Sequence, residues 1–326
     1  MEYFRLNDMS KPRVLTIIGP TVSGKTELSV KTAEIISQKY NKQVEIISAD
    51  SRQVYKHIPI ATAQPSEDIL NTYKHYFINE LELDEDFNAG EFGKKGRKII
   101  NDIIANGKLP LIVGGSGLYI DSLVNGLFDY ENLSTDKEFK QNQAAIRAKL
   151  YEELNNSGID KLIADLDKVD PETASLIDRF TERRVIRALE VYYLTGIPIS
   201  VHRSNKIKID FEAVKIGISM DKEKLYERIN QRTDKMIDYG LIDEVIALKE
   251  KGYHYSTMNS LNTVGVKEIF DFIDGKLNLN EAVNLIKQNS RRFAKRQMTW
   301  FRRYDDVNWI DSNSGIEKWI NSEIVR

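Results

Sequence analysis

The feature that most constrains the fold is an eight-residue glycine-rich loop. Residues 19–26 read GPTVSGKT, which matches the pattern G-x-x-x-x-G-K-[ST]. The loop follows the β-branched run RVLTII and leads into the helical sequence KTELSVKTAEIISQKY. In this strand–loop–helix context the backbone amides and the helix N-terminus form an anion cradle, which predicts phosphate binding. The alternative is a glycine-rich turn that binds nothing.

Further apolar runs indicate a parallel sheet. The run QVEIISAD follows the first strand at the spacing of one βαβ unit, and LPLIVGG, FEAVKIGISM and VNWID have the same texture. Between the second and third runs, helical periodicity begins at Glu91 and stops at Gly107. Apolar strands that alternate with helices predict the fold class α/β, with a doubly wound parallel sheet as the P-loop core.

The middle of the chain lacks this alternation. From about Asp129 the sequence has helical periodicity and no strand signal, and Asp170 is expected to cap a helix that begins at Pro171. We therefore predict a helical insertion at residues 129–183. The P-loop core, with a helical C-terminal portion, is expected to comprise residues 1–128 and 184–326 and to end in the strand VNWID.

Composition excludes several classes of chemistry. The chain has no cysteine, which excludes disulfides and thiolate metal sites, and its four histidines never lie at ligand spacing. No apolar run approaches the roughly 20 residues that span a bilayer, and the N-terminus is polar, so we expect a cytoplasmic protein without membrane contact. The net charge of −2 means that a nucleic-acid partner requires a local basic face.

Each part of the loop has an expected role. Lys25 supplies a positive charge to the bound phosphate groups, and the Thr26 hydroxyl is a magnesium ligand. The residues expected to hold the phosphate groups are Gly19, Pro20, Thr21, Val22, Ser23, Gly24, Lys25 and Thr26.

Polar residues also follow the second and third strands. Asp50 and Ser51 come directly after one strand, and Ser116 lies in a glycine turn after the next. Ligands bind at the carboxyl ends of parallel strands, where Asp50 could act as general base or bind Mg²⁺ and Ser116 could bind a phosphate oxygen. On local grounds, helix capping by Asp50 or Ser51 and a simple turn at Ser116 are equally consistent.

The segment RRFAKRQMTWFRRY (291–304) contains six basic residues and no acid. At 100° per residue its apolar side chains share one arc, and Gln297 is the polar residue within that arc, so it needs an internal partner. A one-sided basic helix favours contact with nucleic-acid phosphates, although a solvated amphipathic face has the same pattern. Arg228 and Arg232 also share a helical face and could form an anion clamp, but the neighbouring Glu227 and Asp234 favour a solvated face of ion pairs on local grounds.

Together these stretches resemble the tRNA dimethylallyltransferases (tRNA isopentenyltransferases) of the bacterial type. The matching runs are GPTVSGKTELS, ISADSRQVY, IATAQP, FNAGEF, LIVGGSGLYI, RRVIRALEVYYLTGIPIS, RINQRTDKMIDYGLIDEV, VGVKE and KRQMTWFRRY. They occur in family order from about residue 14 to residue 304. The loop by itself is generic, whereas the ordered set is specific.

The resemblance implies transfer of a dimethylallyl group from dimethylallyl diphosphate to N6 of adenosine 37, 3′-adjacent to the anticodon of tRNA. The loop then holds a diphosphate that leaves, with Mg²⁺ on Thr26. The resemblance assigns catalytic roles to Asp50 as the base, to Ser116 where the family usually has threonine, and to Arg232 as a diphosphate-binding arginine. The expected tRNA contacts are Asp50, Ser51, Arg52, Gln53, Ser116, Arg183, Arg184, Val185, Ile186, Arg187, Asn262, Thr263, Val264, Gly265, Val266, Lys267, Lys295, Arg296, Gln297, Met298, Thr299, Trp300, Phe301 and Arg302.

The sequence departs from the family pattern at three positions expected near tRNA. Ala61 replaces a glycine, Gln64 a lysine and Val266 an aromatic residue. These changes bear on tRNA contact and leave the expected chemistry intact. A monomer is expected, because nothing in the sequence indicates a larger assembly.

Three other functions are compatible with parts of the sequence. A small-molecule P-loop kinase would need an arginine-rich lid, and the sequence has no obvious one. An adenylate isopentenyltransferase acting on free AMP would need neither the basic helix nor the helical insertion. A nucleic-acid-binding module with a vestigial loop would not bind diphosphate.

Overall fold

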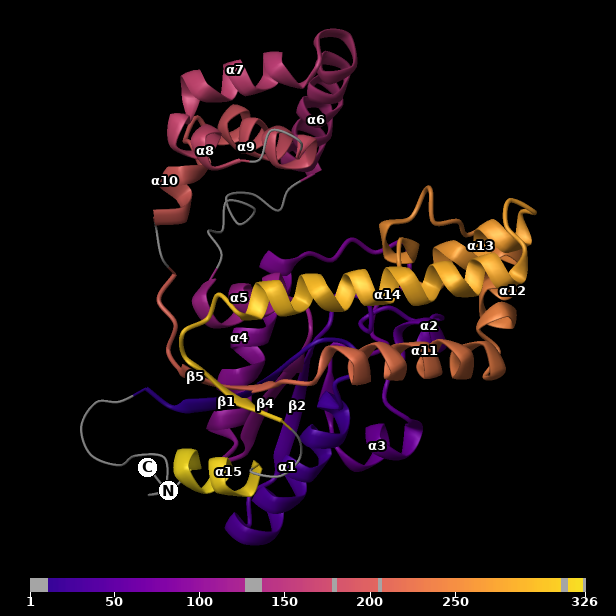
Figure 1. Cartoon of the computed structure of the whole chain (residues 1–326). Helices are drawn as coiled ribbons and strands as arrows, with labels where there is room; N and C mark the ends of the chain where they lie inside the picture. The colour runs from indigo at the N-terminus through magenta and orange to yellow at the C-terminus, as the bar shows by residue number, and fades with distance from the viewer. Residues whose placement is uncertain (1–10, 127–136, 178–180, 205–206, 312–315, 325–326) are drawn as a thin grey trace. The chain divides into compact units, whose positions relative to one another are not determined.

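The computed structural model describes residues 11–126, 137–177, 181–204, 207–311 and 316–324. The chain divides into two compact units. The first unit combines Met1–Val124 with Ile209–Arg326, and the second comprises Asn125–Lys208. The first unit contains every strand of the described chain (Figure 1).

A six-stranded parallel sheet forms the centre of the first unit. In spatial order its strands are β3 (His75–Tyr76), β2 (Val44–Ala49), β4 (Leu109–Gly114), β1 (Arg13–Ile18), β5 (Glu212–Ile218) and β6 (Val307–Ile310). The predicted strands and their parallel arrangement are confirmed. The two-residue strand β3 was not predicted, because so short a segment has no periodicity.

The strand register brings three loops to one edge of the sheet. Gly114 pairs with Ala49 on one side and with Ile18 on the other, so β1, β2 and β4 end at the same level. The chain leaves β1 toward β2 on one side, while β5 lies on the other side of β1. Such a reversal opens a crevice beyond the carboxyl ends of the strands. The loops that begin at residues 19, 50 and 115 therefore face a common space.

Helices cover both faces of the sheet. The first unit contains α1 (Lys25–Tyr40), α2 (Pro59–Thr62), α3 (Glu67–Thr72), α4 (Ala89–Ala105), α5 (Gly117–Asp121), α11 (Lys222–Asp238), α12 (Leu241–Glu250), α13 (Val266–Ile273), α14 (Leu279–Phe301) and α15 (Ile316–Ile324). Helices α1 and α15 share one apolar core with alternate residues of the strands, while α4 and α5 cover the opposite face (Figure 1). The expectation that the chain ends in β6 is wrong, because Ile316, Trp319 and Ile320 of α15 are buried in that core.

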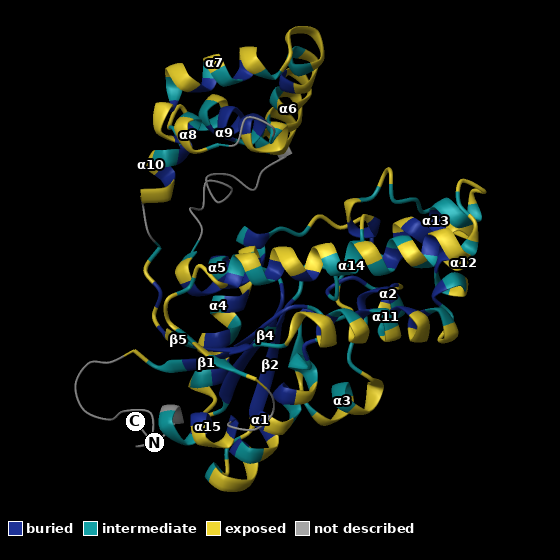
Figure 2. Cartoon of the chain, in the orientation of Figure 1, coloured by how far each residue is buried: buried dark blue, intermediate teal, exposed yellow. Residues whose placement is uncertain are grey.

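Helices α11 to α14 form a separate helical layer. The long helix α14 packs against α13 and α11, and near its end it packs against α5 (Figure 1). It presents a buried stripe to these neighbours and an exposed stripe outward (Figure 2). Its capping box is formed by Asn278 and Glu281. Helix α14 therefore contacts both α5, which follows β4, and α11.

The second unit is helical, as predicted. It contains α6 (Lys137–Ser157), α7 (Ile159–Val169), α8 (Pro171–Leu176), α9 (Glu182–Thr195) and α10 (Ile199–Ser204). Asp170 caps α8 by accepting a hydrogen bond from the Thr173 amide at 3.0 Å, as predicted. The boundary expected at residue 128 lies outside the described residues. The boundary expected at 183 is wrong, because α9 packs on α6 and α7 and extends the unit to Lys208.

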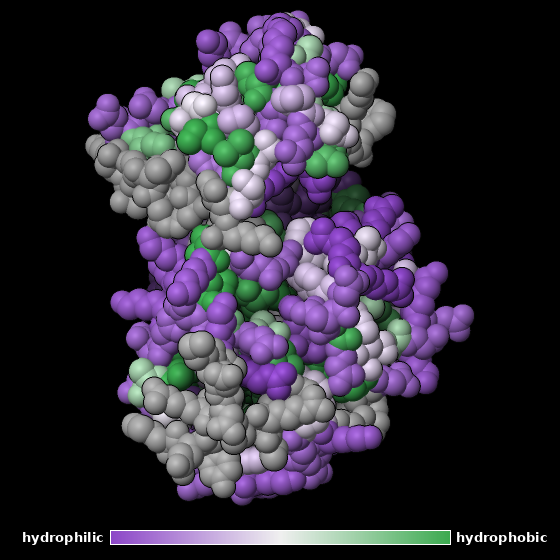
Figure 3. Space-filling model, turned by 90° about the vertical axis from the view of Figure 1, so that its left-hand side faces the viewer, coloured by the Kyte–Doolittle hydropathy of each residue, from purple (hydrophilic) through white to green (hydrophobic). Residues whose placement is uncertain are grey.

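No helix in the described part of the chain is long and apolar enough to cross a membrane. The face of the molecule in Figure 3 is mostly hydrophilic, with scattered apolar patches.

Candidate active site

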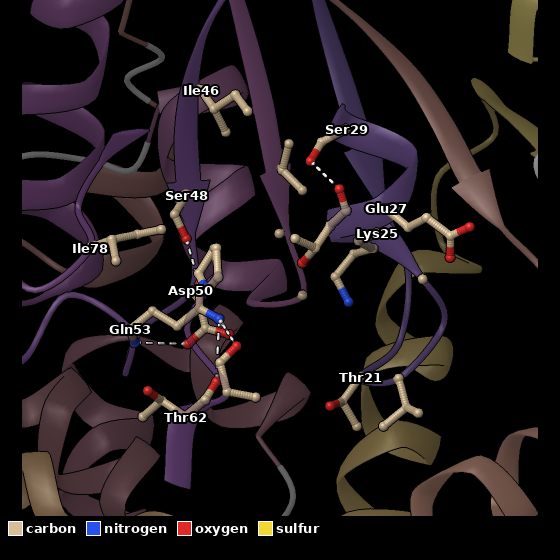
Figure 4. Close-up of a pocket in the computed structure, with 18 of the residues that line it drawn as sticks. Thr21, Lys25, Glu27, Ser29, Ile46, Ser48, Asp50, Gln53, Thr62 and Ile78 are labelled. Carbon is tan, nitrogen blue, oxygen red and sulfur yellow. Dashed lines mark hydrogen bonds between the residues drawn. The ribbon is translucent and has the colours of Figure 1, made fainter. Parts of the chain in front are cut away.

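The three loops at the edge of the sheet surround a cavity of about 380 Å³. Figure 4 shows Lys25 and Thr21 of the glycine-rich loop on one side of this cavity and Asp50, Ser48 and Gln53 on the other. The apolar part of the lining includes Ile46 of β2, Val113 of β4 and Ile78. The cavity therefore offers a charged region for phosphate groups next to an apolar region.

The glycine-rich loop has an unusual backbone. Gly24, at the N-cap of α1, has φ of 92°, which is the left-handed region that glycine tolerates best. Val22 has φ of 66°, and a β-branched residue in that region is strained. Strain of this kind persists where the surrounding structure enforces it. The loop is thus held in a fixed conformation at the N-terminus of α1, where backbone amides and the helix dipole favour an anion.

Lys25 is a desolvated cation in this loop. Its Nζ donates to the Pro20 carbonyl at 2.7 Å and lines the cavity. Burial lowers the pKa of Lys25 to about 8, although the nearby carboxylate of Asp50 raises it and Arg232 lowers it further. An anion bound in the cavity would favour the protonated form of Lys25 for the same electrostatic reason that Asp50 does.

Arg232 of α11 is a second cation beside the loop. Its guanidinium donates from Nη1 to the Thr21 hydroxyl at 2.7 Å. Its Nε is buried and has no hydrogen-bond partner in the described part of the chain. Burial lowers the pKa of Arg232, while Asp50 opposes that shift. A buried donor without a partner is rare in proteins, and a bound anion would supply an acceptor.

Asp50 lies between these cations and the second loop. Its Oδ1 accepts the backbone amides of Arg52 at 2.8 Å and Gln53 at 3.3 Å, which fixes the carboxylate on the turn after β2. Its Oδ2 has no hydrogen-bond partner among the described residues. One oxygen therefore holds the side chain in place, and the other is free to accept a proton.

Ser116 joins the turn after β4 to the turn after β2. Its hydroxyl oxygen accepts the Ser51 amide at 3.1 Å, and its hydroxyl lies 3.4 Å from that of Ser51. The structure therefore brings together the three residues predicted to be catalytic, Asp50, Ser116 and Arg232, around the same loops.

A second cavity of about 280 Å³ adjoins the first. Both cavities are lined by Asp50, Arg232, Thr21 and Phe293. The rest of the second cavity includes Asn262, Thr263, Val264 and Arg296, which were predicted to contact tRNA. Asp50 and Arg232 thus lie at the junction between a phosphate-loop cavity and a cavity bordered by the basic helix.

Several residues predicted to contact tRNA have buried side chains instead. The buried side chains are those of Val185, Ile186, Val266, Gln297 and Phe301. Among them, Gln297 also lines the first cavity. Their neighbours Lys267, Lys295, Arg296, Thr299 and Arg302 are exposed. The difference follows from helical periodicity, because a contiguous run of residues on a helix covers every face. Arg183 and Arg184 are exposed on α9 of the second unit.

Gln297 has the internal partners that its sequence position requires. Its Oε1 accepts the Thr21 amide at 2.8 Å, and its Nε2 donates to the Gly115 carbonyl at 2.9 Å. Arg52, also predicted to contact tRNA, donates from Nη1 to the Asn259 carbonyl at 2.6 Å. These three partners could not be found from the sequence, because each lies on an element far along the chain.

Two of the residues that depart from the family pattern, Gln64 and Ala61, make hydrogen bonds inside the protein. Gln64 donates to the carbonyls of Gln53 and Tyr55 at 3.0 and 3.1 Å, which braces the turn that carries Asp50. Ala61 is buried, and its amide donates to Glu244 at 2.9 Å. Sequence reasoning also missed cavity residues such as Phe293, Ile46 and Thr62, since apolar and hydroxyl residues carry no motif of their own.

For the magnesium ion expected from the sequence, the cavity offers the hydroxyl of Thr26 as a ligand. Thr26 lines the cavity at the start of α1. The described residues contain no group of three or more His, Asp or Glu side chains that could enclose a metal ion. Magnesium commonly keeps water and substrate phosphate ligands and takes only one or two from protein.

A phosphate loop after β1, two desolvated cations and a carboxylate shared by two cavities define a P-loop enzyme with room for a phosphorylated substrate and a second substrate. The family model described as IPP transferase matches residues 53–304. The chain belongs to this family.

The sequence identity to curated relatives supports this membership. A tRNA dimethylallyltransferase of Acetivibrio thermocellus is 43% identical over 304 residues, which is 92% of each chain. One from Natranaerobius thermophilus is 41% identical over 302 residues, covering 93% of this chain and 87% of the relative.

Solved structures are similar as well. The full-length tRNA isopentenylpyrophosphate transferase of Bacillus halodurans has a TM-score of 0.67 and 34% identity, covering 96% of both chains. A eukaryotic dimethylallyltransferase acting on tRNA has a TM-score of 0.73 and 27% identity, covering 94% of this chain and 75% of that one. These similarities favour the tRNA enzyme over the kinase, the AMP enzyme and the binding module.

Proposed function

We propose that this chain transfers the dimethylallyl group of dimethylallyl diphosphate to N6 of adenosine 37 in tRNA and releases diphosphate. The observation that carries the proposal is the position of Asp50 and Arg232 at the junction of the two cavities. The donor diphosphate would bind in the first cavity against the loop. The target adenine would enter the second, so that its amine approaches the allylic carbon beside Asp50.

The charges of the first cavity suit a leaving diphosphate. The allylic C1 can bear positive charge, so the barrier lies mainly in stabilising the negative charge on the departing group. Lys25, Arg232 and the loop amides are already oriented around the cavity, and such preorganised donors are worth most where water is excluded. The unpartnered Nε of Arg232 is available for a diphosphate oxygen. Thr26 would hold a magnesium ion at the start of α1, and that ion would supply further positive charge to the diphosphate.

The acceptor needs a base. The lone pair of the adenine amine is delocalised into the ring, which makes the amine a weak nucleophile. As the C–N bond forms, the amine must lose a proton, and Oδ2 of Asp50 has no competing hydrogen bond. Asp50 is held by Oδ1, so the accepting oxygen keeps its position through the reaction. Positioned carboxylates of this kind contribute about 10²–10⁴-fold to a rate.

The exposed face of α14 supports a tRNA acceptor. Lys295, Arg296 and Arg302 project from it, and Arg296 also borders the second cavity. The target adenine lies in a loop, so its extrusion costs unstacking but no base pairing. Contacts between α14 and the tRNA phosphates would provide favourable binding free energy that offsets the cost of unstacking. Arg183 and Arg184 of the second unit are proposed as further contacts.

The test is transfer of label from radiolabelled dimethylallyl diphosphate in the presence of Mg²⁺. The acceptors are an anticodon stem-loop with adenosine next to the anticodon, the same stem-loop with guanosine at that position, and AMP. Label in the first acceptor alone is the expected result. Label in AMP would assign the chain to free nucleotides, and no label in any acceptor would reject the proposal.

A further inference from the structure

The buried side chain of Gln297 connects the basic helix to the two loops of the active site. Gln297 is 6% exposed, and both ends of its amide are engaged. The Thr21 N–H can only donate and the Gly115 carbonyl can only accept, so the two bonds fix which end of the amide is oxygen. The helix of the expected tRNA contacts is therefore bonded directly to the phosphate loop.

The bond to Thr21 controls a peptide group that also holds Lys25. The Thr21 N–H and the Pro20 carbonyl belong to one planar peptide unit. Gln297 accepts from the N–H side of this unit, and Lys25 Nζ donates to its carbonyl at 2.7 Å. Rotation of the peptide would break both bonds. Gln297 thereby fixes the carbonyl that determines where the Lys25 ammonium lies before the donor binds.

The bond to Gly115 acts on the second loop. A Cβ atom at residue 115 would lie 2.3 Å from Nε2 of Gln297, so glycine is required for this close approach. The next residue is Ser116, whose hydroxyl accepts the Ser51 amide. One side chain thus sets the separation between the loop after β1 and the turn after β4.

Thr21 receives a second restraint from α11. Its hydroxyl accepts from Arg232 at 2.7 Å, while its amide is held by Gln297. The two helices are themselves joined near this point, because Arg291 of α14 donates to Asn230 of α11 at 2.7 Å. Thr21 is therefore the residue at which both helices act on the phosphate loop.

We propose that Gln297 is a positioning residue that holds Lys25 and the Ser116 turn in the geometry required by the donor diphosphate. It does so through its hydrogen bonds to the Pro20–Thr21 peptide and to the Gly115 carbonyl. The inference rests on the proposed function for the identity of the donor. The alternative is that Gln297 only satisfies buried polar groups and contributes to stability alone.

The test compares two variants that each lose side-chain hydrogen bonds. Gln297→Met keeps the length of the side chain and removes both bonds. Tyr304→Phe is the matched control, because it removes one hydrogen bond to α5, from the tyrosine hydroxyl to Asp121 at 2.7 Å, away from the phosphate loop. For both variants we would measure the melting temperature, the Kd of inorganic diphosphate with Mg²⁺, and the separate KM values of donor and stem-loop.

The expected result for Gln297→Met is an increase of about tenfold in the diphosphate Kd and the donor KM, with the stem-loop KM unchanged. Tyr304→Phe should lower the melting temperature but keep both donor constants within twofold. Unchanged donor constants in Gln297→Met, or equal changes in the two variants, would overturn the inference. A wild-type protein that does not bind diphosphate would also overturn the inference. Diphosphate binding without transfer to the stem-loop would reject the proposed function and leave the comparison of variants valid.

Discussion

Replacement of Asp50 by asparagine isolates its role as a base. The amide oxygen of asparagine can still accept the backbone amides of Arg52 and Gln53, now held at 2.8 and 3.3 Å by Oδ1. The turn after β2 should therefore keep its conformation. The second oxygen becomes an NH₂ group, which cannot take a proton from the adenine amine. The substitution removes basicity and retains shape.

The expected loss in kcat follows from that chemistry. General bases contribute about 10²–10⁴-fold, which corresponds to about 3–5 kcal/mol of transition-state stabilisation. A smaller indirect effect accompanies it, because the Asp50 carboxylate raises the pKa of Lys25. Without that carboxylate Lys25 loses its proton more readily, so the comparison should be made well below pH 8, where the lysine remains charged in both proteins.

The assay is single-turnover transfer to an adenosine-containing stem-loop at saturating donor, with the Kd of the stem-loop measured separately. We expect at least a hundredfold lower rate, an unchanged stem-loop Kd and an unchanged melting temperature. Asp68→Asn, at an exposed carboxylate of α3, is the control and should be indistinguishable from wild type. A rate for Asp50→Asn within threefold of wild type would show that another group takes the proton.

Three further predictions follow from individual contacts. Lys25→Met should weaken diphosphate binding by more than about tenfold in calorimetry, because a desolvated cation facing the anion is lost; unchanged binding would mean that the loop does not hold the diphosphate. Arg296→Ala should weaken stem-loop binding and reduce its logarithmic salt slope by about one phosphate contact, whereas an unchanged slope would make α14 an ordinary solvated face. Glu190→Gln should destabilise the chain by about 2 kcal/mol near pH 7, because buried Glu190 accepts hydrogen bonds from Arg147 and Gln143. Burial opposes the ionisation of Glu190, but these hydrogen bonds and the charge of Arg187 outweigh burial and lower the pKa of Glu190. The destabilisation should therefore disappear as the pH falls through that pKa. A difference in urea midpoint that does not depend on pH would contradict this account.

Sequence patterns with a local cause were predicted well. The strands β1, β2 and β4, the phosphate loop and the Asp170 cap each depend on a few neighbouring residues. The short strand β3 and helix α15 were missed. The two residues of β3 have no periodicity, and α15 is held in place by a core that includes α1 and β1. The boundary at 183 was wrong for a similar reason, because α9 belongs with helices that precede it by many residues.

The sequence by itself determined the P-loop fold, the resemblance to the family and the residue types of the site. A glycine-rich loop, an acid after a strand and a basic amphipathic helix are encoded within short segments, so each can be recognised locally. Only the tertiary structure decided which members of those segments face a ligand and which face the protein. Gln297 lies within the basic motif, yet its amide connects Thr21 to Gly115. Asp50 borders both cavities because the strand register places three loops at one level. Such relations depend on contacts between residues far apart in the chain, which only the packing of helices on the sheet creates.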